Sequence, residues 1–159
     1  MKDEMPITKK GHQAISDELD HLIKIEREEI KKAIAEAREL GDLKENAEYH
    51  SAKEKQSLIE GRIMQLQSIM AKSRIIDLSS VKSDKIAFGA TVTLLNEDSE
   101  KIIYQIVGPD ESDTAKGKIS FTSPLGKALI GKETGDTVIV KAPKGDIEYE
   151  IEDFEFVED

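Results

Sequence analysis

Two carboxylates three positions apart, Asp42 and Glu45, are the residues of this sequence best suited to chemistry. They lie in a short break between two long helix-like segments, and at this spacing both side chains lie near one face if a helix begins there. Carboxylate oxygens are hard ligands of the kind that Mg²⁺ prefers, and a bound Mg²⁺ can orient a water for hydrolysis of a phosphodiester. Two ligands are too few for a dedicated magnesium site, so a partner or a phosphate would complete the coordination.

A purely structural role explains the same pair of residues, and their spacing alone favours it. Asp42 has the side chain of an ordinary helix N-cap, and the Asp-x-x-Glu pattern at 42–45 resembles a capping box. The two interpretations are compatible, because a capping carboxylate can still present its side chain to a ligand.

Two apolar stripes with helical spacing flank the break and must position it. Steps of three and four residues separate their members, which is the spacing of a coiled-coil seam. The first stripe, which Glu26 interrupts, consists of Ile15, Leu19, Ile23, Glu26, Ile30, Ala33, Ala37 and Leu40. The second stripe consists of Tyr49, Ala52, Gln56, Ile59, Ile63, Leu66 and Met70. Thr8 can cap a helix from Lys9 to Leu40, and Gly41 can end it. The pattern predicts an antiparallel helical hairpin whose tip is the break.

The second half of the chain changes to a period of two, which is typical of strands. Expected strands cover 91–95, 101–107, 118–121, 137–140 and 147–151, and 124–131 can form one short helix. We therefore predict an α+β protein in which an N-terminal antiparallel coiled-coil hairpin precedes a small antiparallel sheet domain. The predicted boundaries are 1–78 for the hairpin with its tip at 41–46, 79–84 for a serine-rich linker, and 85–159 for the sheet domain.

Composition and charge limit the environment and the partners of the chain. Its 159 residues include no cysteine, which excludes disulfides and thiolate metal sites and suggests a reducing compartment such as the cytoplasm. Neither a signal peptide nor a membrane-spanning apolar run is present, so no membrane contact is expected. The net charge is −2 in residues 1–78 and −8 in residues 79–159. Free nucleic acid should repel the second half, so a nucleic-acid contact would come from the first half or be made on a protein partner.

The tip segment, Glu39 to His50, resembles the tip signature of the GreA/GreB family of bacterial transcript cleavage factors. Further matching pieces extend along the chain at 33–38, 60–63, 88–92 and 129–132. The resemblance covers nearly the whole sequence, and a ten-residue tip is more specific than a short motif.

This resemblance implies a function as well as a fold. Members of the family combine a coiled-coil hairpin with an FKBP-like domain that docks on the rim of the secondary channel of RNA polymerase. The hairpin reaches the catalytic centre, where the tip carboxylates, here Asp42 and Glu45, help to hold a second Mg²⁺ and a water. The polymerase then cleaves its own backtracked transcript at the nascent RNA 3′ end. On this basis the chain is a factor and not an enzyme, binds no Mg²⁺ alone, and is expected to be a monomer.

Three further pairs of residues carry over from the family by position. Arg38 and Lys53 match a basic patch that contacts the displaced RNA, although Lys53 stands where an arginine is expected and loses bidentate phosphate geometry. Ser123 and Pro124 match the segment that meets the channel rim, and a helix N-cap followed by proline explains them equally simply. Leu43 and Lys44 make the tip closer to GreA than to GreB, which implies short cleavage products.

Other functional classes remain alternatives to transcript cleavage. An FKBP-like fold makes prolyl isomerase or chaperone activity an alternative function. Aromatic residues make up only 4% of the chain, however, and there is no tryptophan to line a proline pocket. A secondary-channel inhibitor or a coiled-coil adaptor is the third class. The tip matches the cleavage-promoting pattern of the family and not that of its inhibitory relatives.

Overall fold

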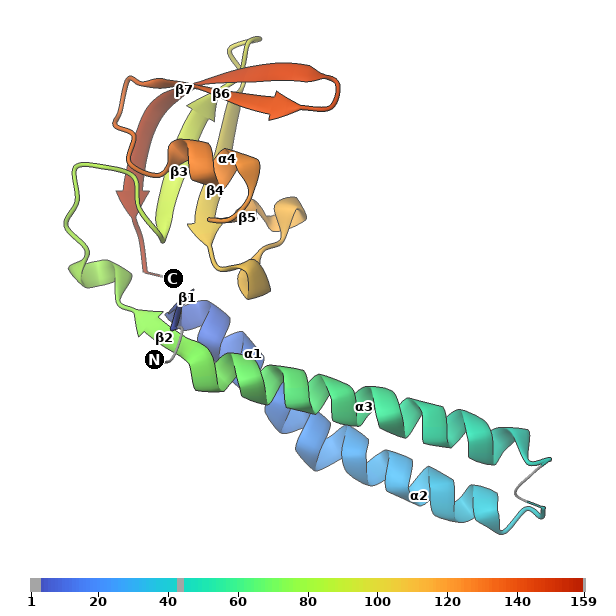
Figure 1. Cartoon of the computed structure of the whole chain (residues 1–159). Helices are drawn as coiled ribbons and strands as arrows, with labels where there is room; N and C mark the ends of the chain where they lie inside the picture. Colours follow the sequence, from blue (N-terminus) through green and yellow to red (C-terminus); the bar gives the residue numbers. More distant parts are fainter. Residues whose placement is uncertain (1–3, 43–44, 159) are drawn as a thin grey trace. The chain divides into compact units, whose positions relative to one another are not determined.

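The computed structural model describes residues 4–42 and 45–158, which form an α+β protein with two compact units (Figure 1). The helical unit is His12–Ser73. The sheet unit combines the segment through Gly11 with the chain from Arg74 onward. The predicted helical hairpin and the predicted sheet domain are both present. Among the described residues, no helix is long and apolar enough to cross a membrane.

The helical unit is a hairpin of two arms. The first arm contains α1 (Lys9–His21), the π-helical segment η1 (Leu22–Glu26) and α2 (Arg27–Arg38), and the second arm is α3 (Ala47–Lys72). α2 packs along α3, and the chain reverses between them at one end of the hairpin (Figure 1). The seam between the arms is apolar, and its fully buried members are Ile15, Leu22, Ile30, Ile34, Ala37, Ile59, Ile63 and Leu66.

The predicted stripe on α3 is confirmed, and the stripe on the first arm is confirmed at Ile15, Ile30 and Ala37, which are buried. Leu22, at the start of the π-helical segment, is more deeply buried than the predicted Ile23, and Ile34 is more deeply buried than the predicted Ala33. Leu40 was expected on the seam but lies beyond the end of α2 and is 66% exposed.

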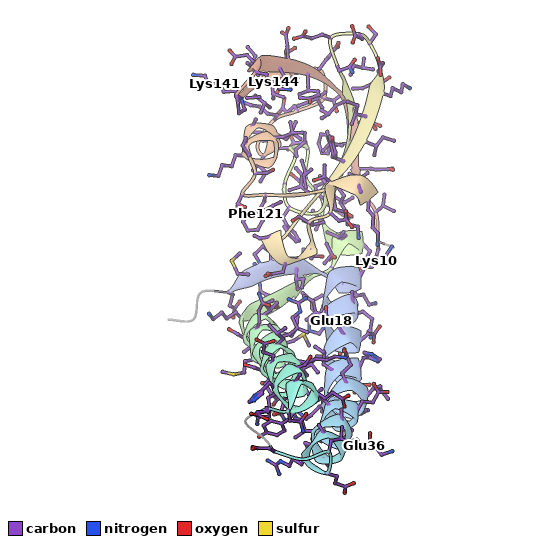
Figure 2. The ribbon with its side chains drawn as sticks, turned by 90° about the vertical axis from the view of Figure 1, so that its right-hand side faces the viewer. Lys10, Glu18, Glu36, Phe121, Lys141 and Lys144 are labelled. Carbon is purple, nitrogen blue, oxygen red and sulfur yellow. The ribbon has the colours of Figure 1, made fainter. Side chains whose placement is uncertain are left out.

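Two bidentate ion pairs fix the register of the arms. Arg27 donates to Glu60 at 2.8 and 2.9 Å, and Arg62 donates to Glu18 at 2.6 and 2.9 Å. Figure 2 labels Glu18 and Glu36, which lie at two levels of the first arm. Because these side chains are partly exposed, each pair adds little to stability, but paired fork geometry specifies which residues face each other.

The sheet unit contains five strands in the order β5-β4-β3-β7-β6. The strands are β3 (Ala90–Leu95), β4 (Lys101–Val107), β5 (Lys118–Ser120), β6 (Thr137–Ala142) and β7 (Gly145–Phe156). Neighbouring strands are antiparallel except β5, which is parallel to β4. The prediction of an antiparallel sheet is therefore wrong at this edge. Two 3₁₀ turns, η3 (Pro109–Glu111) and η4 (Thr114–Lys116), carry the chain back so that β5 runs in the direction of β4.

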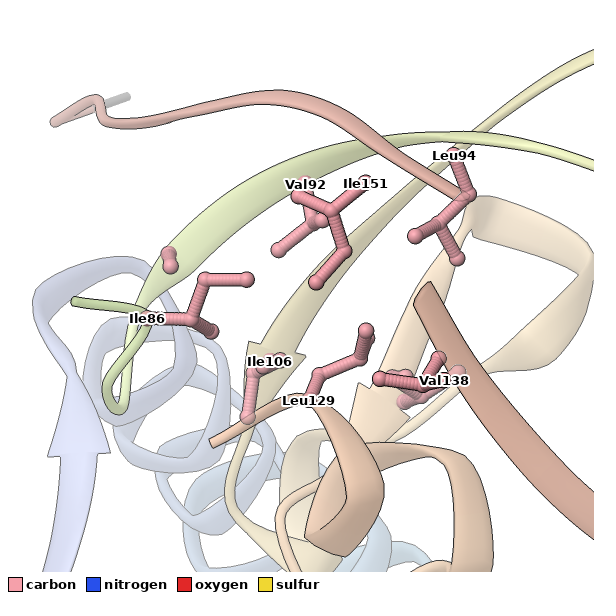
Figure 3. Close-up of a cluster of buried hydrophobic side chains, with 9 residues drawn as sticks. Ile86, Val92, Leu94, Ile106, Leu129, Val138 and Ile151 are labelled. Carbon is pink, nitrogen blue, oxygen red and sulfur yellow. The ribbon is translucent and has the colours of Figure 1, made fainter. Parts of the chain in front are cut away.

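One face of the sheet forms the core with the short helix α4 (Pro124–Leu129), which lies over it (Figure 1). Alternate residues of β3 point into this core, so Ala90, Val92 and Leu94 are fully buried. Figure 3 shows how aliphatic side chains from the strands meet Leu129 of the helix. The remaining fully enclosed members of this cluster are Ile86, Ile106 and Ile151.

The N-terminal segment belongs to the sheet unit, whereas the sequence pattern placed residues 1–78 together as the hairpin domain. Residues predicted to start the helix form a strand, β1 (Met5–Thr8), which pairs with β2 (Ser73–Ile76). Thr8 does cap α1 as predicted, because its hydroxyl accepts the Gly11 N–H at 3.0 Å. The start of the predicted linker at 79–84 forms a 3₁₀ turn, η2 (Leu78–Ser80), in which Leu78 is buried.

Candidate functional site

The predicted catalytic carboxylates lie at the free end of the hairpin, between α2 and α3 (Figure 1). Asp42 and Glu45 are both exposed, and both precede α3. Leu43 and Lys44 lie outside the described residues. Gly41 has a φ of 137°, in the region that favours glycine, but α2 already ends at Arg38 with Glu39 as its C-cap, so Gly41 does not end the helix as predicted. The carboxylates therefore sit on the turn itself and not on one face of a helix.

Asn46, not Asp42, is the N-cap of α3. Its Oδ1 accepts the Tyr49 N–H at 3.0 Å, and its Nδ2 donates to the Ala37 carbonyl at 2.5 Å. The predicted cap at Asp42 is therefore wrong, for a physical reason. Asparagine caps helices as well as aspartate does, and the one next to the first helical residue takes the position.

Asn46 is also a residue of the site that sequence reasoning missed. Its place directly before a helical pattern could have identified it as a cap. Its second hydrogen bond, to a carbonyl of the other arm, depends on how the arms pack and leaves no trace in the local sequence.

The predicted basic patch has one residue on each arm. Arg38 is the last residue of α2, and its guanidinium carbon lies 5.8 Å from the centroid of the Tyr49 ring, within the range of a cation–π interaction. Lys53 is exposed on α3, where its Nζ lies 3.3 Å from the Gln56 side chain. Tyr49 is half-buried, as its seam position predicted, and it also holds the Arg38 side chain across the end of the hairpin.

The donor set at the tip fits a shared Mg²⁺ site. Asp42 and Glu45 supply hard anionic oxygens on an exposed turn. Within residues 4–42 and 45–158, no group of three or more histidines, cysteines or carboxylates comes together as a possible metal site. Asp42 and Glu45 are fewer oxygen ligands than the octahedral coordination of Mg²⁺ requires.

Ser123 and Pro124 are at the start of α4. Ser123 Oγ accepts the Gly126 N–H at 3.1 Å and donates to the Ser120 carbonyl at 2.6 Å, so the structural role of an N-cap is confirmed. Pro124 follows at the first helical position and is exposed. Figure 2 labels Phe121 just before this segment. The exposed proline is available to a partner, whereas the serine is occupied by the helix.

Comparison with known proteins places both halves of the chain in one family. The family model described as "Transcription elongation factor, N-terminal" matches residues 5–75. The model described as "Transcription elongation factor, GreA/GreB, C-term" matches residues 81–156. Together they extend over the hairpin and the sheet.

Individual relatives agree with the family models. A protein named transcription elongation factor GreA from Thermodesulfovibrio yellowstonii is 55% identical, with 95% of this chain and 96% of that protein covered. One of the same name from Methylobacterium sp. (strain 4-46) is 52% identical, with coverage of 98% and 99%. Among solved structures, GreA factor homolog 1 (Gfh1) of Thermus thermophilus is 28% identical with a TM-score of 0.44, over 95% of this chain and 98% of that one.

Proposed function

Because the chain belongs to the GreA/GreB family of transcription elongation factors, we propose that it stimulates RNA polymerase to cleave backtracked nascent RNA. Its function is that of a transcription elongation factor, and such factors act on RNA polymerase. The finer proposal is that the hairpin enters the secondary channel and brings its tip to the catalytic centre. Cleavage there releases complexes in which the RNA 3′ end has been displaced.

The observation that carries this proposal is the exposed pair Asp42 and Glu45 on a turn whose helix is capped by another residue. A role as helix caps would by itself explain why carboxylates occupy these two positions. Since Asn46 caps α3, Asp42 is not the N-cap, and its match to the catalytic position of the family supports the proposal.

The chemistry follows from the donors on the tip. Asp42 and Glu45 would hold a Mg²⁺ together with ligands of the polymerase, and a metal bound there would activate a water and stabilise charge on the phosphate. The chain contributes anionic oxygens and presents them on the end of a two-helix rod. Arg38 and Lys53 would attract RNA phosphates without reading sequence, because point charges on the backbone carry no base information. In this proposal the polymerase cleaves the RNA, and the factor supplies part of the metal coordination.

We assign binding to the polymerase rim to the sheet unit. The half of the chain that contains it carries a net charge of −8, which suits a protein partner better than free nucleic acid. The exposed Pro124 next to the capping Ser123 is the part of this surface that matches the docking segment of the family. In this proposal the sheet unit binds as an FKBP-like domain, the coiled-coil hairpin does the chemistry, and one monomer serves one cytoplasmic polymerase.

A transcript-cleavage assay tests the proposal directly. Stalled, backtracked complexes with 5′-labelled RNA would be incubated with Mg²⁺ and with the factor, with the polymerase omitted in one arm. We expect shortened RNA only when the factor and the polymerase are both present. Binding without cleavage would instead identify a channel-blocking inhibitor, and cleavage by the factor alone would contradict the proposal.

A further inference from the structure

The side chain of Asn46 joins the ends of the two hairpin arms. Its Oδ1 accepts the N–H of Tyr49 in the first turn of α3, and its Nδ2 donates to the carbonyl of Ala37 in the last turn of α2. First-turn N–H groups and last-turn carbonyls of helices have no partner within their own helix. The Ala37 carbonyl also accepts the Leu40 N–H at 3.1 Å, so the amide satisfies an unpaired donor of one arm and adds a second bond to a carbonyl of the other.

The orientation of the Asn46 amide is fixed by its neighbours. One end of the amide faces an N–H, so it must be the oxygen, and the other end faces a carbonyl, so it must be the nitrogen. Ala37, whose carbonyl receives the bond, is buried at 4% exposure and cannot easily move away. The bond to the first arm is thus anchored in the packed seam and not in a mobile surface group.

Capping alone does not require this second bond. Serine, threonine and aspartate cap helices about as well as asparagine, but they offer only an acceptor or a short hydroxyl at that position. The amide of asparagine is long enough, and carries both a donor and an acceptor, to hold two helix ends at once. The turn with Asp42 and Glu45 runs between the two attachment points, Ala37 and Asn46.

From this geometry we infer that Asn46 is a positioning residue for the tip carboxylates. It ties together the two helix ends between which Asp42 and Glu45 lie, in addition to starting α3. This inference rests on the proposed function, since it concerns how accurately Asp42 and Glu45 meet the polymerase. Loss of the link to Ala37 should leave the hairpin folded while it loosens the loop.

The matched test is Asn46→Ser, which keeps a cap acceptor and removes the reach to Ala37. Asn46→Asp is the second variant, since it keeps the length and the cap acceptor but has no donor for the Ala37 carbonyl. Asn96→Ser is the control, because Asn96 caps a turn of the sheet unit through its Oδ1 with the Asp98 and Glu100 N–H groups. Each variant is assayed as the full chain with backtracked polymerase.

We expect helicity, protection of the Tyr49 amide and polymerase affinity to stay at wild-type values in both Asn46 variants. Cleavage at saturating factor should fall about 10- to 100-fold, because small displacements of a reacting group have costs of this size. The Mg²⁺ concentration for half-maximal cleavage should rise as well. A merely structural role would change the melting temperature but not the Mg²⁺ dependence at saturation.

Two outcomes would overturn the inference, and only one of them would also overturn the proposed function. If both Asn46 variants cleave at the wild-type rate with unchanged Mg²⁺ dependence, while Asp42→Asn with Glu45→Gln is inactive, Asn46 is only a cap and the proposed function stands. If Asp42→Asn with Glu45→Gln cleaves normally, the carboxylates are not used, and the proposed function and the inference both fail.

Discussion

Glu111 accepts hydrogen bonds from the backbone N–H and the hydroxyl of Thr8, which lies 103 residues earlier in the chain. The same carboxylate also accepts the Gly108 N–H at 3.1 Å. Thr8 is only 4% exposed, so its polar groups need these partners. An added Cβ at Gly11 would overlap the Glu111 side chain, which would have to move.

Removing this carboxylate should destabilise the sheet unit. We expect Glu111→Ala to lower the free energy of unfolding by about 1–3 kcal/mol, since it leaves buried donors of Thr8 without an acceptor. Gly11→Ala should also lower the free energy of unfolding, because the added Cβ displaces the Glu111 carboxylate. Urea denaturation followed by circular dichroism measures both, with the exposed Glu100→Ala as the control. A Glu111 variant as stable as this control would show that the contacts of Glu111 contribute nothing.

Neutralising the tip should separate cleavage from binding. Asp42→Asn with Glu45→Gln keeps side-chain volume and leaves the cap at Asn46 untouched, so the hairpin should keep its helicity. Loss of preorganised electrostatic contacts commonly costs about 10²–10³ in rate, and we expect at least that here. The variant should also inhibit cleavage by the wild-type factor, because it competes for the same polymerase. Absence of inhibition at high excess would argue against binding through the sheet unit.

The basic patch should depend on Tyr49 as well as on its own charges. Tyr49→Leu keeps an apolar seam residue but removes the ring beneath Arg38. An exposed cation–π contact contributes about 0.5–1 kcal/mol, so in Tyr49→Leu the factor concentration for half-maximal cleavage should rise about two- to fivefold. In Arg38→Ala this concentration should rise by at least as much. Lys32→Ala, exposed on α2, is the control. If Tyr49→Leu and the wild type need the same factor concentration for half-maximal cleavage, the Tyr49 ring does not contribute to the function of Arg38.

Acid should weaken the pair that joins the arms at Glu18. The hydrogen bond from Arg62 lowers the pKa of the Glu18 carboxyl below its ordinary value of 4.5. The folded hairpin therefore binds fewer protons than the unfolded chain, and the contribution of this pair is present above the unfolded pKa and lost as pH falls through the folded one. We expect wild type and Glu18→Gln to differ in stability by a constant amount above about pH 5 and to converge as the pH falls through the lowered pKa of Glu18. A difference that does not change with pH would rule out this linkage.

Two substitutions at the start of α4 should separate its structural role from its role in docking. Ser123→Ala removes the cap and should destabilise the sheet unit by about 1 kcal/mol. Pro124→Ala keeps the cap and an acceptable first helical residue, so it should leave stability within about 0.5 kcal/mol while weakening polymerase binding. Thermal denaturation and a binding titration measure the two effects. Wild-type affinity for Pro124→Ala would remove this residue from the docking surface.

Local periodicity was sufficient to predict one arm and most of the sheet. The stripe from Tyr49 to Met70 keeps its helical steps without interruption, and alternation on 91–95 identifies the buried face of β3. On the first arm, the pattern identifies Ile15, Ile30 and Ala37 as buried but misses Leu22, which starts a π-helical turn that nothing in the composition of Leu22–Glu26 marks.

Contacts between distant segments were beyond the reach of sequence patterns. The parallel direction of β5 depends on the path of two 3₁₀ turns, and the partnership of Thr8 with Glu111 depends on the folded sheet unit. At the tip, the carboxylates were identified by family resemblance, whereas the link from Asn46 to Ala37 required the packed arms.

The division of the chain after Gly11 and after Ser73 makes the hairpin an insertion within the sheet unit. During synthesis, Thr8 leaves the ribosome long before Glu111 exists, and β7, which pairs between β3 and β6, is the last strand to be made. The hairpin contains only sequence-local partners and can form as soon as α3 has emerged. We therefore expect the hairpin to fold before the sheet unit, whose strand pairing is completed only when β7 has been made.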